Sequence, residues 1–114
     1  TWKAAPGNGE RLFALRRSLG IPRPLFSTLA DVSVRSLADC ETKTTVPKSV
    51  RPRLNEALRL LHALLDIIPP EDLRSWLTTP NSGFQNERPL DLIQKGERDR
   101  IWAMIYQTRV GAFS

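Results

Sequence analysis

Few residues of this chain could carry catalytic chemistry. The 114 residues include one histidine, His62, and one cysteine, Cys40. Covalent catalysis needs a nucleophile beside a base, and a zinc site needs about four ligands, so these two residues supply neither. The adjacent carboxylates Glu71 and Asp72 are typical of the first turn of a helix rather than of an acid–base pair. The sequence therefore predicts a protein that is not an enzyme and that holds no metal or cofactor.

Three further features have structural interpretations. His62 and Asp66 stand four residues apart, which predicts a pair on the surface of a helix. Cys40 occupies an inward helical position and is interpreted as a small buried apolar residue. Gly7-Asn8-Gly9 has no strand before it and no lysine after it, so it does not predict a phosphate-binding loop.

Positive charge is concentrated in the first half of the chain. The formal net charge is +5, and residues 1–57 contain ten Lys or Arg against five Asp or Glu, whereas residues 58–114 contain seven of each kind. Lysine and arginine gain affinity for phosphates by releasing counterions, so the basic half indicates a polyanion partner. A basic surface that only keeps the protein soluble is the alternative.

The spacing of apolar residues predicts an all-α fold. Helices are expected over residues 10–19, from the prolines at 22 and 24, and over 34–41, 53–68, 71–77, 89–94 and 97–110. The helix over 53–68 is apolar around most of its circumference, which predicts burial from two sides. It should either join the two halves of the chain or pair with a second copy. No apolar run approaches the roughly 20 residues of a membrane helix, and a lone cysteine favours the reducing cytoplasm.

Residues 25–41 have the spacing of a helix-turn-helix. Small Ser27 lies where the two helices cross, Asp31 stands in the turn, and Ser33 is a good cap for the second helix. Asp31 replaces the usual glycine, although aspartate tolerates the left-handed conformation better than most residues. Such a unit presents the start of its second helix to a DNA major groove. The candidate DNA contacts are Ser33, Arg35, Ser36 and Asp39 at bases, and Lys43, Lys48 and Arg51 at phosphates. A three-helix unit without DNA binding is the alternative.

The second half contains residues that fix local shape, in a distinctive order. They are Trp76-Leu77, Pro80-Asn81, Phe84, Pro89-Leu90-Asp91-Leu92-Ile93, Gly96-Glu97 and Gly111. This order resembles the C-terminal toxin-binding domain of Xre/MbcA/ParS-type antitoxins, closely over about residues 58–114. Glu41 followed by Pro47 also resembles the end of an Xre-like helix-turn-helix. From the residues alone, most of the apolar ones are expected to form a small core.

The resemblance implies a type II antitoxin of a RES-type toxin–antitoxin system. Such an antitoxin blocks the active site of a toxin that consumes NAD or transfers ADP-ribose, and it represses its own operon through the helix-turn-helix. We expect a cytoplasmic homodimer within a larger complex, with operator DNA as a second partner and no membrane association. Candidate toxin contacts are Asn81, Arg88, Glu97, Arg98, Arg100, Arg109, Gly111, Phe113 and Ser114. A dimeric transcriptional regulator without a toxin partner is the alternative.

The predicted organisation has three parts. Residues 1–9 form a flexible leader, residues 10–52 the Xre-like helix-turn-helix unit, and residues 53–114 a bridging helix with the toxin-binding and dimerisation domain.

Overall fold

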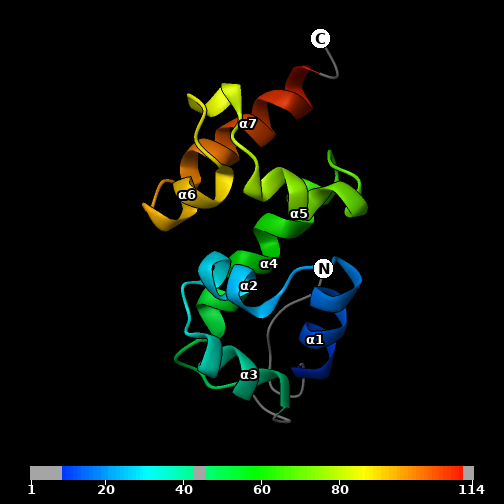
Figure 1. Ribbon diagram of the computed structural model, residues 1–114, viewed down its shortest axis with the longest axis vertical. Coiled ribbons are helices and arrows are strands. Elements are labelled where there is room, and N and C mark those ends of the chain that lie inside the picture. Colours follow the sequence, from blue (N-terminus) through cyan, green and yellow to red (C-terminus); the bar gives the residue numbers. More distant parts are fainter. Residues whose placement is uncertain (1–8, 43–45, 112–114) are drawn as a thin grey trace. The chain divides into compact units, whose positions relative to one another are not determined.

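The computed structural model describes residues 9–42 and 46–111, and this part of the chain is helical with no strand (Figure 1). Its elements are α1 (Gly9–Ser18), α2 (Arg23–Ala30), α3 (Val34–Thr42), α4 (Arg51–Leu65), α5 (Pro70–Thr78), the 3-10 turn η1 (Ser82–Phe84), α6 (Pro89–Gln94) and α7 (Arg98–Gly111). The all-α prediction is confirmed. Of the expected leader, only Gly9 lies within the described residues, where it begins α1.

The chain forms two compact units, and the division falls between Arg59 and Leu60. We call the residues up to Arg59 unit 1 and those from Leu60 unit 2. The division lies inside α4, so one helix contributes to both units. The assignment of DNA binding to residues 10–52 and toxin binding to 53–114 remains a prediction.

Helix α4 differs at both ends from the expected span of 53–68. It begins at Arg51 because Pro52 is tolerated in a first turn, where no backbone N–H partner is lost. It ends at Leu65, and the N–H groups of residues 67 and 68 both donate to the carbonyl of Leu64 in a closing turn. Residue 68 precedes Pro69, which disfavours further helix. On one face of α4, Leu54, Leu58 and Leu61 are buried, each 0–1% exposed.

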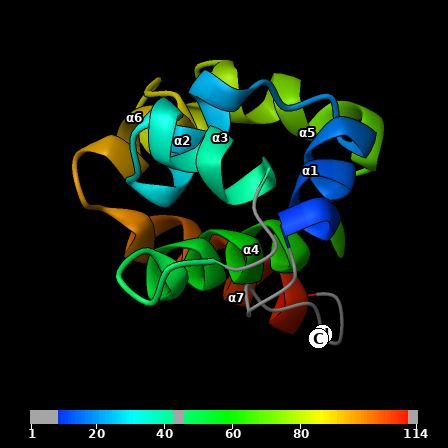
Figure 2. The ribbon, with the colours of Figure 1, turned by 90° about the horizontal axis from the view of Figure 1, so that it is seen from below.

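Unit 1 is built around α3, which packs against both α1 and α2 (Figure 2). The fully buried side chains of this unit include Leu12, Phe26, Leu29 and Leu37, one or more from each of its first three helices. Cys40 is buried as expected. Burial of side chains this size contributes about 1.5–3 kcal/mol each, so the mutual packing of the three helices holds the turn between α2 and α3 in place.

Unit 2 has its own core, in which α6 packs against α5 and α7. Leu73, Leu77, Leu92, Ile101 and Ile105 are buried there. Glycine 96 has a φ of +80°, the left-handed conformation that ends α6 and turns the chain into α7. Much of the apolar sequence in this region therefore forms a core, as the residues alone predicted.

Candidate functional site

The turn between α2 and α3 has the conformation that the sequence predicted. Asp31 adopts the left-handed region, with φ 55° and ψ 47°, at the position where a glycine is usual. Arg53 donates from Nη1 to the backbone carbonyl of Asp31 at 3.2 Å, which ties the start of α4 to this turn. Ser27 of α2 is buried, and its hydroxyl donates to the carbonyl of Pro24 at 2.8 Å. The polar group of this small buried side chain is thereby satisfied within its own helix.

Ser33 caps α3. Its Oγ accepts the backbone N–H of Ser36 at 3.0 Å and donates to the hydroxyl of Ser36 at 2.9 Å. A capping hydroxyl satisfies a backbone donor that the helix leaves without a partner. The cap confirms the predicted start of α3 at Val34.

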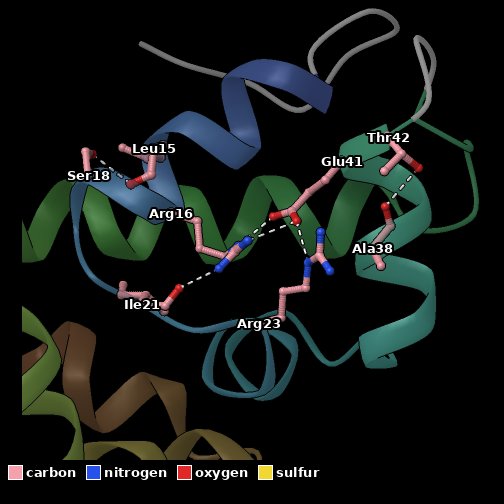
Figure 3. Close-up of polar contacts among 8 residues, drawn as sticks. All are labelled: Leu15, Arg16, Ser18, Ile21, Arg23, Ala38, Glu41 and Thr42. Atoms are coloured by element: carbon pink, nitrogen blue, oxygen red, sulfur yellow. Dashed lines mark hydrogen bonds and ion pairs between the residues drawn. The ribbon is translucent and has the colours of Figure 1, made fainter.

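A buried ion cluster joins the helices of unit 1 (Figure 3). Glu41 on α3, with 1% of its side chain exposed, accepts from Nε of Arg16 on α1 at 2.6 Å and from Nε of Arg23 on α2 at 2.8 Å. Arg16 adds a second bond from Nη2 at 3.1 Å and donates from Nη1 to the carbonyl of Ile21 at 3.0 Å. Both carboxylate oxygens are therefore satisfied, which is the condition for burying such a charge.

This cluster fixes α1, α2 and α3 relative to one another within unit 1. The sequence analysis missed its ion pairs, although a signal was present. Arg16 lies on the inward stripe between Leu12 and Leu19, and Glu41 directly follows buried Cys40. A positive and a negative residue at inward helical positions predict a buried pair, because neither charge is stable there alone.

The predicted DNA contacts have different environments. Arg35 and Asp39 are exposed on α3, and Lys48 is exposed before α4. The hydroxyls of Ser33 and Ser36 bond to each other, as described above. Arg51 is half-buried and donates from Nη2 to the carbonyl of residue 46 at 2.9 Å. Lys43 lies outside the described residues. Arg35 and Asp39 are thus the outward-facing candidates on α3.

The expected surface pair of His62 and Asp66 is wrong. Asp66 follows the end of α4 and pairs instead with Arg109 of α7, with 2.6 Å between the oxygen and the nitrogen. His62 is half-buried, and its Nε2 is buried without a hydrogen-bond partner among the described residues. The four-residue spacing fails because Asp66 no longer has the helical geometry that would bring the two side chains together.

In unit 2, Asn81 organises the loop between α5 and α6. Its Oδ1 accepts the backbone N–H of Gly83 at 2.8 Å, which caps η1. Its own backbone forms an isolated antiparallel bridge with Glu87, through an N–H···O bond of 3.1 Å. Trp76 of α5 packs edge-on against Phe84 of η1, with ring centroids 6.2 Å apart. The segment between α5 and α6 is therefore a closed and locally bonded loop.

Charged candidates of unit 2 gather around α6 and the start of α7. Glu87 pairs with Lys95 and, at 3.7 Å, with Arg100, which also bonds Glu97 at 3.0 Å. Lys95 donates from Nζ to the Glu87 carboxylate, and this hydrogen bond raises the pKa of Lys95 above its ordinary value. These groups lie at least a quarter exposed, so solvent screens the pairs and a charged partner could replace them.

Arg88 forms a two-pronged pair with Asp91 on the first turn of α6. The distances are 2.9 Å from Nε to Oδ2 and 2.7 Å from Nη2 to Oδ1. The hydrogen bonds from Arg88 lower the pKa of Asp91 below its ordinary value, and those to Asp91 raise the pKa of Arg88.

The remaining candidates lie along α7 or beyond its end. Arg98 is half-buried at the start of α7, and Arg109 is exposed near its end. Gly111 is the last residue of α7, while Phe113 and Ser114 lie outside the described residues. Of the predicted contact residues, the structure brings together Glu97 and Arg100 at the start of α7.

Two shallow hollows lie on unit 2. One, of about 280 Å³, is lined by Asp72, Ser75, Trp76, Thr79, Pro80 and Asn81. The other, of about 380 Å³, is lined by Gly83, Phe84, Arg100, Ala103, Met104 and Gln107. Each contains one of the predicted contact residues, Asn81 or Arg100, beside an aromatic side chain. Such mixed surfaces suit protein contacts, in which aromatic and arginine side chains are enriched.

Two negative findings apply to residues 9–42 and 46–111. No three of their His, Cys, Asp and Glu side chains lie in a group that could hold a metal ion. No helix there has both the length and the apolar character needed to cross a membrane.

The geometry defines an all-helical protein with a helix-turn-helix followed by a small helical domain. Residues 60–101 match the model of the family described as the antitoxin Xre/MbcA/ParS C-terminal toxin-binding domain. The resemblance that the sequence suggested is thereby confirmed.

Relatives support the same conclusion. The chain is 29% identical over 96 residues to the mycobacterial cidal antitoxin MbcA of Mycobacterium tuberculosis H37Rv, with 83% of this chain and 85% of the relative covered. The corresponding MbcA of Mycobacterium bovis matches equally. The fold also matches a chain in the crystal structure of the M. tuberculosis MbcT–MbcA toxin–antitoxin complex. The TM-score is 0.67 at 23% identity, with 93% of this chain and 96% of that chain covered.

Proposed function

We propose that this chain is a type II antitoxin whose unit 2 binds and neutralises a partner toxin and whose helix-turn-helix represses its own operon. The observation that carries the proposal is the match of residues 60–101 to a toxin-binding domain family. Similarity to a named antitoxin over 83% of the chain supports the same role for the whole molecule.

For the toxin we propose a RES-type enzyme that consumes NAD or transfers ADP-ribose, with its active site blocked by unit 2. The contact would centre on Asn81 and Arg100, because each lines a hollow beside an aromatic side chain. Arg88, Glu97, Arg98 and Arg109 would surround this centre, and residues 111–114 would extend it. Half-exposed ion pairs such as Arg100–Glu97 can exchange partners at little cost in free energy.

The test is co-expression of the full chain with the products of its neighbouring reading frames, a RES-type toxin being the expected one. We expect rescue of growth, preserved cellular NAD and co-purification of the two proteins. Arg100→Glu should weaken rescue, because it reverses a charge at the proposed centre, whereas Arg11→Glu on α1 is a matched reversal in unit 1 that should not. If the chain rescues growth from no product of an adjacent gene, the antitoxin role is overturned. Rescue that survives deletion of residues 111–114 would remove the tail from the interface.

For DNA, we propose that α3 enters the major groove of an operator and that Arg35 contacts a guanine. Arg35 is exposed and bonds no other described residue, so its guanidinium is available for a bidentate contact. The basic unit would add phosphate contacts from Lys43, Lys48 and Arg51. Arg35→Ala should abolish the specific shift of promoter DNA in a gel. Arg74→Ala removes one exposed positive charge from α5 and serves as the control, which should bind as wild type does.

We also propose that the protein acts in the cytoplasm as a homodimer within a larger toxin–antitoxin complex. A helix-turn-helix dimer reads two half-sites one helical turn apart, which gives the affinity that a single small unit lacks. Light scattering on the free chain, and on the chain with its toxin, measures both stoichiometries. A monomer that binds a single half-site would contradict the dimer.

The alternative function is a dimeric transcriptional regulator without a toxin partner. The capped α3 and the left-handed turn at Asp31 support DNA binding equally in either case. The co-expression experiment separates the two functions. A regulator without a toxin partner would bind DNA but would restore growth with none of the adjacent gene products.

A further inference from the structure

One exposed side chain in the helix-turn-helix is apolar. Val34, the first residue of α3, is 44% exposed. In the described part of the chain, the other exposed large apolar side chains are Tyr106 and Val110. Leu37 and Cys40, which follow on the same helix, are buried. Val34 is therefore the apolar member of α3 that the core of unit 1 leaves in solvent.

The cap of α3 engages the serine hydroxyls beside Val34. The hydroxyls of Ser33 and Ser36 bond to each other, and that of Ser33 also accepts the backbone N–H of Ser36. They therefore have less capacity to bond a base than the sequence suggested. The side chains at the start of α3 that remain exposed are those of Val34 and Arg35, which are neighbours in the chain.

We infer that Val34 is a specificity-determining residue that packs on the C5-methyl group of a thymine beside the guanine contacted by Arg35. This inference rests on the proposed DNA binding. Thymine is the base that presents a methyl group in the major groove, and apolar side chains recognise it. The positive charge of residues 1–57 favours DNA over a protein as the partner of this face. A side chain with no hydrogen-bonding group distinguishes thymine from cytosine by the methyl group alone.

The expected size of the effect follows from apolar burial. Removing one methyl group from a buried apolar contact should weaken binding about fourfold. A fourfold change is small compared with the total affinity, but it depends on one base of each half-site. It can therefore be separated from phosphate contacts, which weaken all sequences alike.

The test begins with selection of a duplex from a randomised library by the full wild-type chain. Each thymine of the selected duplex is then replaced singly by uracil, which removes only the methyl group. We expect wild type to lose about fourfold in affinity at one thymine of each half-site. Val34→Ala should bind the parent duplex about fourfold more weakly and should show no further loss at that thymine.

Two further variants make the result specific. Val110→Ala truncates another exposed valine, on α7, and should keep the full uracil effect of wild type. Val34→Thr keeps the branched shape and replaces one methyl group by a hydroxyl, so its uracil effect should be reduced.

The outcomes separate the two proposals. DNA binding with no loss at any uracil, or an equal loss in wild type and Val34→Ala, would overturn the role of Val34 and leave DNA binding intact. A wild-type chain that selects no duplex would overturn DNA binding, and the role of Val34 with it.

Discussion

Arg16 and Glu41 stand 25 residues apart in the chain and form a two-pronged buried ion pair, with Nε–Oε2 and Nη2–Oε1 distances of 2.6 and 3.1 Å. Arg23 shares the same carboxylate. One acidic group thus connects three helices of unit 1. A buried pair of this kind adds little net stability relative to apolar residues, but loss of one partner leaves a buried charge alone. Glu41 is therefore the residue on which the arrangement of α1, α2 and α3 depends most.

The first prediction concerns Glu41. Glu41→Gln should lower the free energy of unfolding by about 3 kcal/mol, because Arg16 stays buried without its counter-charge. Urea denaturation of the full chain measures the change. Glu71→Gln, at an exposed position in the first turn of α5, is the control and should change it by less than about 0.5 kcal/mol. Equal effects of the two substitutions would show that the cluster does not support the fold.

The turn at Asp31 gives the second prediction. A β-branched residue in this left-handed conformation is destabilised by about 1–2 kcal/mol, whereas glycine adopts it without strain. Asp31→Val should therefore lower the melting temperature, while Asp31→Gly should hold or raise it. Asp39→Gly is the control, since glycine within α3 should destabilise by about 1 kcal/mol. Destabilisation of similar size by both glycines would contradict the role assigned to the turn.

The third prediction concerns the loop that Asn81 organises. Asn81→Ala removes the acceptor for the Gly83 N–H and should lower the free energy of unfolding by about 1 kcal/mol. Asn81→Asp keeps an acceptor oxygen at the same place, and its stability should match wild type closely. Thermal unfolding compares the two variants. If both lose toxin binding while aspartate keeps stability, Asn81 contacts the toxin directly; if only alanine loses it, Asn81 acts by shaping the loop.

A fourth prediction follows from the pair of Arg88 and Asp91. Because the folded-state pKa of Asp91 is lowered, the pair contributes stability above the unfolded pKa of about 3.9, and this contribution is lost as the pH falls through the folded value. Arg88→Gln should raise the pKa of the Asp91 carboxyl, measured by NMR titration. The difference in the free energy of unfolding between Arg88→Gln and wild type should become smaller as the pH falls and Asp91 is protonated. Arg74→Gln is the control. An equal rise of the Asp91 pKa in this variant would show that Arg88 is not the specific cause of the lowered value.

The sequence predicted local features well and long-range ones poorly. The capped start of α3 and the left-handed turn at Asp31 depend on residues that are neighbours, so residue type indicated both. The pairing of Arg16 with Glu41 depends on how three helices meet, which no short spacing encodes. The bridge between Asn81 and Glu87 was missed for a similar reason, since two single residues have no strand periodicity. Partner contacts stay predictions, because surface residues are not constrained by the core.

The last prediction concerns His62 on α4. Its Nε2 is buried without a hydrogen-bond partner among the described residues, which leaves a polar atom desolvated and uncompensated. His62→Leu should therefore raise the free energy of unfolding by about 1 kcal/mol, since leucine keeps the apolar contacts and removes the polar atom. His62→Gln keeps a polar end and is the control, which should give no gain. Urea denaturation of the full chain measures both, with an unchanged slope as the check that the unfolded state is the same. A loss of stability with leucine would show that the imidazole nitrogen is hydrated in solution.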